Sequence, residues 1–195
     1  ISKQRFNLHL IRNICHFSGQ NLWFYAIAII PFSQVFAFEF SSPIWVALLA
    51  PFFLGERLTL VRLATVILGF SGILIVAQPG NITLGPGVIA AALCAIGFAG
   101  TFIATKLLSK TESTTCILFW LVSIQLVLGI AFSFYDADVA IPSLATLPLI
   151  ILVGCAGLLA HYCITTALKL APVMIIAPID FLRLPIIAII GAYFY

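Results

Sequence analysis

The stretch FSQVFAFEFSSPIWVALLAPFFLGER, residues 32–57, indicates the class of this protein. Its first 23 residues carry one formal charge, Glu39, before the charged end at Glu56 and Arg57. At about 1.5 Å per residue, a helix of that length reaches ~35 Å and crosses the ~30 Å hydrocarbon core of a membrane. Pro43 and Pro51 lie inside the span, where membrane helices tolerate proline because neighbouring helices satisfy the freed carbonyls. The stretch therefore predicts a kinked membrane helix with an acid in its middle.

The composition of the whole chain leads to the same class. The chain is 63% hydrophobic and 8% charged, with a mean hydropathy of +1.23. A soluble domain carries roughly 25% charged residues, so a soluble protein is excluded. The links between apolar segments are too short for an inserted soluble domain. We expect an all-α polytopic transmembrane helical bundle with about seven helices, at residues 13–30, 32–54, 60–77, 85–108, 114–135, 145–170 and 173–195.

Basic residues predict how this bundle is oriented. When the links are assigned alternately to two sides, eight of the nine Lys and Arg residues fall on the side of the N-terminal tail. Cytoplasmic links are enriched in Lys and Arg, so the N-terminal end is expected to be cytoplasmic, in a bacterial inner membrane. The eight are Lys3, Arg5, Arg12, Arg57, Arg62, Lys106, Lys110 and Lys169, and Arg183 falls inside the last span.

An internal repeat appears when the chain is shifted by 141 residues. Pro31 then aligns with Pro172, and Glu39 with Asp180, so that a proline is followed eight residues later by an intramembrane acid in both copies. The matched spans lie five helices apart and so cross the bilayer in opposite directions. Inverted repeats of this kind are typical of transporters, whose substrate site lies near the midplane. We expect inverted five-helix repeats, with residues 1–80 ending the first and residues 81–195 forming most of the second.

A series of short motifs marks the second and third spans. They are Pro31, Ser42-Pro43, Leu54-Gly55-Glu56, Arg62, Gly69-Phe70-Ser71-Gly72-Ile73 and Pro79. With these residues the chain resembles the EamA-type ten-helix carriers of the drug/metabolite transporter superfamily. The resemblance implies a secondary carrier that moves a small organic metabolite by alternating access, with this chain as a fragment that covers helices three to nine. Within the family it resembles carriers that import S-adenosylmethionine in intracellular bacteria, although no motif singles out that solute.

Three ionisable residues inside predicted spans are the first candidates for a substrate site. They are Glu39, Asp180 and Arg183. Such residues are costly in a bilayer and usually face the bundle interior or a water-filled cavity. Either Asp180 and Arg183 neutralise each other and hold the bundle together, or the three residues line the substrate path. Glu39 has no basic neighbour in sequence, which also allows a role as a proton site in coupled transport.

Polar and aromatic residues of the first, second and sixth spans are further candidates for substrate binding. The same shift of 141 aligns Gln20-Asn21 with His161-Tyr162. Packing and interhelical hydrogen bonds are the alternative role for such residues. The set comprises Gln20, Asn21, Trp23, Gln34, His161 and Tyr162.

No catalytic motif, metal-ligand spacing or cofactor motif is present, so we expect no enzyme activity, no metal and no cofactor. The expected partners are a small-molecule solute and the lipid bilayer, without nucleic acid. Proton or cation coupling and a homodimer are compatible with the sequence. The rival function is a non-transporting membrane scaffold or assembly protein, in which Glu39, Asp180 and Arg183 would be paired away from any cavity.

Overall fold

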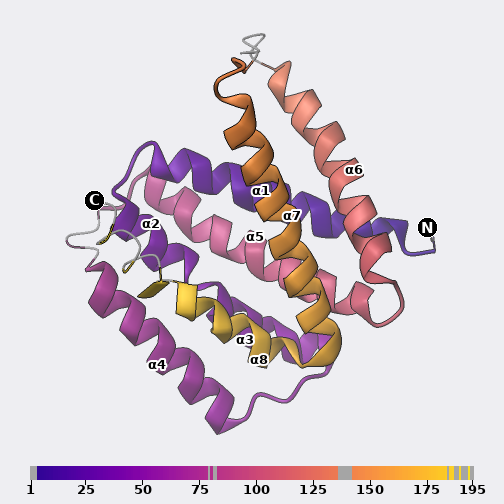
Figure 1. The fold of residues 1–195 in the computed structure, drawn as a ribbon. Coiled ribbons are helices and arrows are strands. Elements are labelled where there is room, and N and C mark those ends of the chain that lie inside the picture. The colour runs from indigo at the N-terminus through magenta and orange to yellow at the C-terminus, as the bar shows by residue number, and fades with distance from the viewer. Residues whose placement is uncertain are drawn as a thin grey trace.

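The computed structural model describes residues 4–78, 80, 83–135, 142–183, 185–186, 189 and 193. The regular elements in these ranges are all helical, which confirms the expected fold class (Figure 1). In chain order they are α1 (Phe6–Ile27), α2 (Phe32–Glu39), α3 (Ser42–Leu54), α4 (Leu60–Ala77), α5 (Pro86–Ser109), α6 (Thr114–Ser133), α7 (Leu147–Leu170), α8 (Val173–Ile179) and the 3-10 turn η1 (Asp180–Leu182).

Several of these helices are long and apolar enough to cross a membrane. Among the described residues they are Phe32–Leu54, which joins α2 and α3, and the helices α5, α6 and α7. The α1 helix begins earlier than expected, at Phe6. Polar residues along α1 make it less apolar than those four spans. The predicted span 173–195 is interrupted after Ile179, and much of its remainder lies outside the described residues.

The burial pattern is that of a protein surrounded by lipid. Large apolar side chains lie on the outside, where Phe52 and Leu60 are each 85% exposed. Polar side chains of α1 lie inside, with Arg12 only 1% exposed and His9 and Asn13 fully buried. A membrane helix turns its polar residues toward the bundle interior because hydrocarbon offers them no hydrogen-bond partners.

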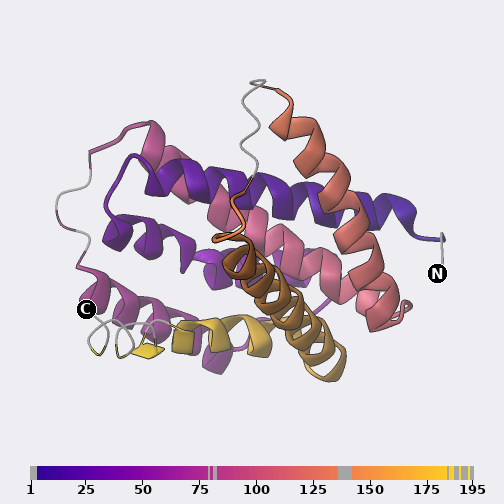
Figure 2. The same cartoon turned by 45° about the horizontal axis from the view of Figure 1, so that its top comes forward.

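Helix α5 is the central element, and α1 lies along it over most of its length (Figure 1). Small residues make this close packing possible, since Ala91, Ala95 and Ala99 of α5 are fully buried. At Gly97 a Cβ atom would lie 2.9 Å from the Cys15 backbone oxygen, so only glycine fits there. Helices α6 and α7 run steeply across this pair in both views (Figure 1, Figure 2).

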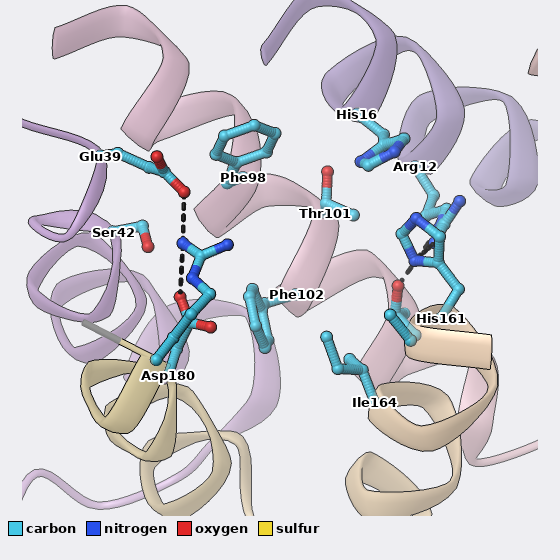
Figure 3. A pocket seen from close by; sticks show the side chains of 13 residues that line it. Arg12, His16, Glu39, Ser42, Phe98, Thr101, Phe102, His161, Ile164 and Asp180 are labelled. Carbon is cyan, nitrogen blue, oxygen red and sulfur yellow. Dashed lines mark hydrogen bonds and ion pairs between the residues drawn. The ribbon is translucent and has the colours of Figure 1, made fainter. Parts of the chain in front are cut away.

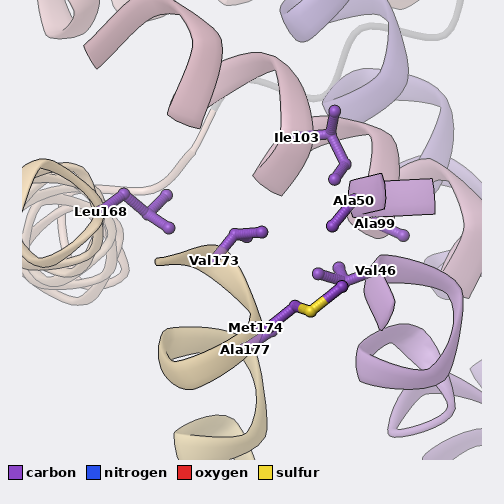
Figure 4. Close-up of a cluster of buried hydrophobic side chains, with 8 residues drawn as sticks. All are labelled: Val46, Ala50, Ala99, Ile103, Leu168, Val173, Met174 and Ala177. Atoms are coloured by element: carbon purple, nitrogen blue, oxygen red, sulfur yellow. The ribbon is translucent and has the colours of Figure 1, made fainter. Parts of the chain in front are cut away.

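The second span is bent between α2 and α3, as its prolines predict. Phe40 and Ser41 interrupt the helix, and Pro43 occupies the first turn of α3, where its missing N–H leaves no bond unmade. The α3 half then packs against α5, α7 and α8 through a buried apolar cluster (Figure 4). The cluster comprises Val46, Ala50, Ala99, Ile103, Leu168, Val173, Met174 and Ala177.

Helices α3 and α8 lie side by side and antiparallel. The Glu56 carboxylate, just after α3, accepts hydrogen bonds from the backbone N–H groups of Val173 (2.9 Å) and Met174 (3.3 Å) at the start of α8. At the other end, Glu39 before α3 pairs with Arg183 after α8. Lys106 of α5 holds the α7–α8 corner by donating to the Leu168 carbonyl at 2.5 Å and the Ala171 carbonyl at 2.8 Å.

Candidate functional site

A cavity of about 240 Å³ lies in the interior of the bundle (Figure 3). Helices α1, α5 and α7 line it together with the α2–α3 bend and the segment after α8. Its walls are formed by Arg12, His16, Glu39, Ser42, Phe98, Thr101, Phe102, Thr105, Ala160, His161, Ile164, Asp180 and Arg183.

One end of the cavity is an ionic cluster of two carboxylates and one guanidinium. Arg183 forms ion pairs with Glu39 and, at 3.3 Å, with Asp180. Trp23 donates its indole N–H to the second oxygen of Glu39 at 2.5 Å, and the guanidinium lies 4.8 Å from the centre of the Phe40 ring. Two carboxylates thus face one guanidinium, so this end of the cavity offers more acidic than basic groups and suits a cationic group.

Two pairs of repeat mates meet at this ionic cluster. Glu39 and Asp180, aligned by the 141-residue shift, are joined through Arg183. Phe40 and Phe181, aligned by the same shift, lie 6.5 Å apart between ring centres. The backbones agree as well, because Pro31 (φ −57°, ψ 144°) and Pro172 (φ −57°, ψ 145°) begin α2 and α8 in the same conformation. These contacts bring the two pairs of repeat mates to one place in the bundle.

The opposite end of the cavity is built from Arg12 and two histidines. The Arg12 guanidinium bonds to Thr105 Oγ1, Asn13 Oδ1 and His161 Nδ1, each at 3.3 Å. Because Arg12 can only donate, Nδ1 of His161 accepts, and the ring carries its proton on Nε2. His16 lies edge-on to His161, with 4.7 Å between ring centres. Both ion pairs found among the described residues belong to Arg183, so Arg12 has no carboxylate partner there.

Between the two ends, the cavity wall is largely apolar. Phe98 and Phe102 of α5 lie between the ionic cluster and the Arg12 end, and Thr101 lies on the side of Arg12 and His16 (Figure 3). An apolar groove of about 500 Å³ adjoins the cavity and shares Phe102, Ile164, Asp180 and Arg183 with it. This arrangement suits a molecule with opposite charges at its ends and a less polar body.

A smaller cavity of about 200 Å³ lies on the other side of the ionic cluster. It shares Glu39, Phe98 and Arg183 with the main cavity and is otherwise lined by Gln20, Trp23 and Phe24. The Glu39–Arg183 pair therefore stands between two cavities that follow each other along α1.

The structure brings part of the predicted site together. Glu39, Asp180, Arg183 and His161 line the main cavity, while Gln20 and Trp23 line the smaller one. Outside both lie Asn21, which donates to the Phe17 carbonyl in its own helix, half-buried Gln34, and Tyr162, which is 50% exposed.

The structure adds to what the sequence says about two residues. Glu39 has no basic neighbour in sequence, but Arg183 and Trp23 reach it from distant segments. Arg12, which the sequence assigned to the N-terminal tail, lies within α1 and is buried in the bundle, because the helix begins at Phe6, seven residues before the expected start of the first span.

Most of the Arg12 end of the cavity was not predicted from the sequence. Arg12 and His16 are four residues apart in a helix, and so are Thr101 and Thr105, a spacing that places each pair on one helix face. That periodicity was the available signal. Ser42 carried no such signal, since the α2–α3 bend directs it to the cavity.

The sequence model of the EamA-like transporter family matches residues 3–78. The chain is 33% identical over 190 residues to a riboflavin transporter of Brucella anthropi, covering 95% of this chain and 67% of the relative. It is 30% identical to an S-adenosylmethionine uptake transporter of Rickettsia bellii, covering 96% of this chain and 63% of the relative.

The fold has a counterpart among solved structures. A crystal structure with 16% sequence identity superposes with a TM-score of 0.75 over 92% of this chain and 64% of the other. The chain thus spans about two thirds of the length of the proteins that it matches. It covers 67% of the riboflavin transporter of Brucella anthropi, 62% of a riboflavin transporter of Rhizobium johnstonii and 63% of the transporter of Rickettsia bellii.

Proposed function

Because this chain belongs to the EamA-like transporter family, we propose that it forms the substrate-binding part of a secondary carrier for a small organic metabolite. The observation that carries the proposal is the cavity with an anionic end at Glu39 and Asp180 and a cationic end at Arg12. A scaffold protein would pair its buried charges away from any cavity, whereas here the pairs line one. The transporter names of the relatives favour a carrier over an enzyme.

The charges of the cavity favour a zwitterionic or cationic solute with a carboxylate. A buried guanidinium without an anion is costly, and a solute carboxylate placed against Arg12 would offset that cost. A cationic group of the solute would lie at Glu39 and Asp180. S-Adenosylmethionine has a carboxylate, an ammonium and a sulfonium, whereas riboflavin has no charged group, so we favour the former of the two solutes named for the relatives.

The size of the cavity agrees with a solute that is only partly enclosed by it. At about 240 Å³ the cavity is smaller than the roughly 300–1,000 Å³ of pockets for drug-sized ligands. The adjoining groove of about 500 Å³ would take the less polar body, such as a heterocyclic ring.

The mechanism that fits this geometry is alternating access with the ionic cluster as a gate. The Glu39–Arg183 pair separates two cavities, and its partners come from two inverted segments that can rock against each other. A solute cation that competes with Arg183 for the carboxylates would loosen the pair and link binding to opening. The repeat boundary near residue 80, the cytoplasmic N-terminal end and a bacterial inner-membrane location belong to this proposal.

Binding and uptake of labelled solutes test the proposal. The purified chain in detergent should bind radiolabelled S-adenosylmethionine saturably and prefer it to riboflavin, and cells that express the chain should accumulate it. Preference for riboflavin would overturn the solute class while leaving a carrier. Saturable binding without accumulation would support the scaffold alternative, and neither binding nor uptake across a broad metabolite panel would overturn the carrier.

A further inference from the structure

A second cluster of polar side chains lies away from the cavity, where α1 meets the start of α6. His9 comes from α1, Glu112 from the link after α5, and Cys116 from the first turn of α6. All three are buried, with exposed fractions of 0%, 7% and 4%. One imidazole nitrogen, one carboxylate oxygen and the thiol sulfur lie within 4.8 Å of one another.

His9 is the unusual member of this cluster. Among the described residues, neither of its ring nitrogens has a hydrogen-bond partner, although the side chain is fully buried. A buried polar group without a partner destabilises the folded state, so native structures rarely retain one without a reason. The ring packs against Trp120, whose centre lies 6.0 Å away, and this contact helps to keep the imidazole at the cluster.

We propose that His9, Glu112 and Cys116 form a binding site for a divalent transition metal ion, with Zn²⁺ as the best match. Imidazole, carboxylate and thiolate are the three ligand types that Zn²⁺ accepts together, and three protein ligands leave a fourth position for water. In a tetrahedral site, donor atoms lie roughly 3.3–3.6 Å apart, so a closure of about 1 Å converts the cluster into a site. Side-chain rotation supplies movements of that size.

The sequence alone did not predict this site. Glu112 and Cys116 are four residues apart, but their third partner lies on α1, far away in the chain. Binding of a metal ion would tie α1 to α6 at the end of the bundle where Arg5 and Lys110 lie. The proposal is independent of the transported solute, since none of the three residues lines the cavity.

Cobalt substitution tests the site directly. The intact chain, purified in detergent and freed of metal with a chelator, is titrated with Co²⁺, which reports a thiolate ligand through a ligand-to-metal charge-transfer absorbance. We expect about one Co²⁺ per chain, displaced by Zn²⁺. Cys116→Ser should abolish the charge-transfer band, and His9→Gln and Glu112→Gln should weaken binding more than tenfold, as loss of a ligand does.

Cys94→Ser is the matched control, because Cys94 is equally buried but lies on α5 outside the cluster. It should leave the band and the stoichiometry unchanged. Zn²⁺ should also raise the melting temperature of the wild type and of Cys94→Ser but not that of Glu112→Gln, by mass action on the folded state. Absence of the band in the wild type, or its persistence in Cys116→Ser, would overturn the proposal.

Discussion

Replacement of Arg12 by glutamine separates a substrate-binding arginine from a structural one. Arg12 is 1% exposed and has three uncharged hydrogen-bond partners but no carboxylate among the described residues. If Arg12 binds the carboxylate of the solute, Arg12→Gln removes a charge-assisted hydrogen bond. Such a bond is worth about 1.5–3 kcal/mol, which corresponds to a roughly 10- to 100-fold loss of affinity.

The effect of the same substitution on stability should be small or favourable. Removal of a buried cation that lacks an anion relieves a desolvation cost, whereas removal of one partner of a buried pair destabilises a protein by about 3–5 kcal/mol. We therefore expect Arg12→Gln to melt at or above the temperature of the wild type in the absence of solute. A structural arginine would show the opposite result.

The assay is equilibrium binding of radiolabelled S-adenosylmethionine and of its decarboxylated analogue to the purified chain. Arg12→Gln should weaken binding of the first and leave binding of the second unchanged. Arg5→Gln serves as the control, because Arg5 lies on the same segment but is exposed and bonds to the Leu107 carbonyl. Equal losses for both solutes, or a lower melting temperature without a change in affinity, would refute the reasoning.

Three further substitutions test the architecture around the cavity by thermal unfolding in detergent. Arg183→Gln and Glu39→Gln should each lower the free energy of unfolding. The double variant should lose less stability than the sum of the two single losses, with a coupling energy of at least ~1 kcal/mol, whereas additive losses would show that the two side chains do not stabilise the fold as a pair. Gly97→Ala should destabilise the fold by about 1–3 kcal/mol, because its Cβ would meet the backbone of α1 at 2.9 Å. The control Gly129→Ala has no described atom within 4 Å of the added Cβ and should be neutral or stabilising. Equal effects of the two substitutions would contradict the tight contact between α1 and α5. Glu56→Ala should cost about 0.5–2 kcal/mol through loss of the cap on α8, and an unchanged melting temperature would show that the cap contributes nothing.

Much of the fold could be predicted from the sequence. The predicted ends of the third span, residues 60–77, agree with α4, because a charged link and a polar link bound its apolar run. The bend after Glu39 follows from Pro43, and the repeat of proline and acid is visible in the chain itself. Local hydropathy and proline chemistry are properties of consecutive residues, so no tertiary contact is needed to recognise them.

The start of α1 was the main error at this level. The first span was placed at residues 13–30 because His9 and Arg12 lower the hydropathy of the residues before it, yet the helix continues back to Phe6. These residues are buried against α5 and α6, where other helices provide their polar surroundings. A hydropathy profile has no access to such partners.

What the sequence by itself determined is the membrane class, the order of the helices and the identity of the repeat mates. Only the tertiary structure decided which charges from distant segments meet. Arg183 comes to Glu39, Arg12 comes to His161, and His9 comes to Glu112. The pair of Asp180 and Arg183, three residues apart, was already an alternative offered by the sequence. Helix packing sets these contacts. The approach of α1 to α5 depends on small residues, and the meeting of α3 with α8 depends on two proline bends. Neither feature can be read from the spacing of the charged residues themselves.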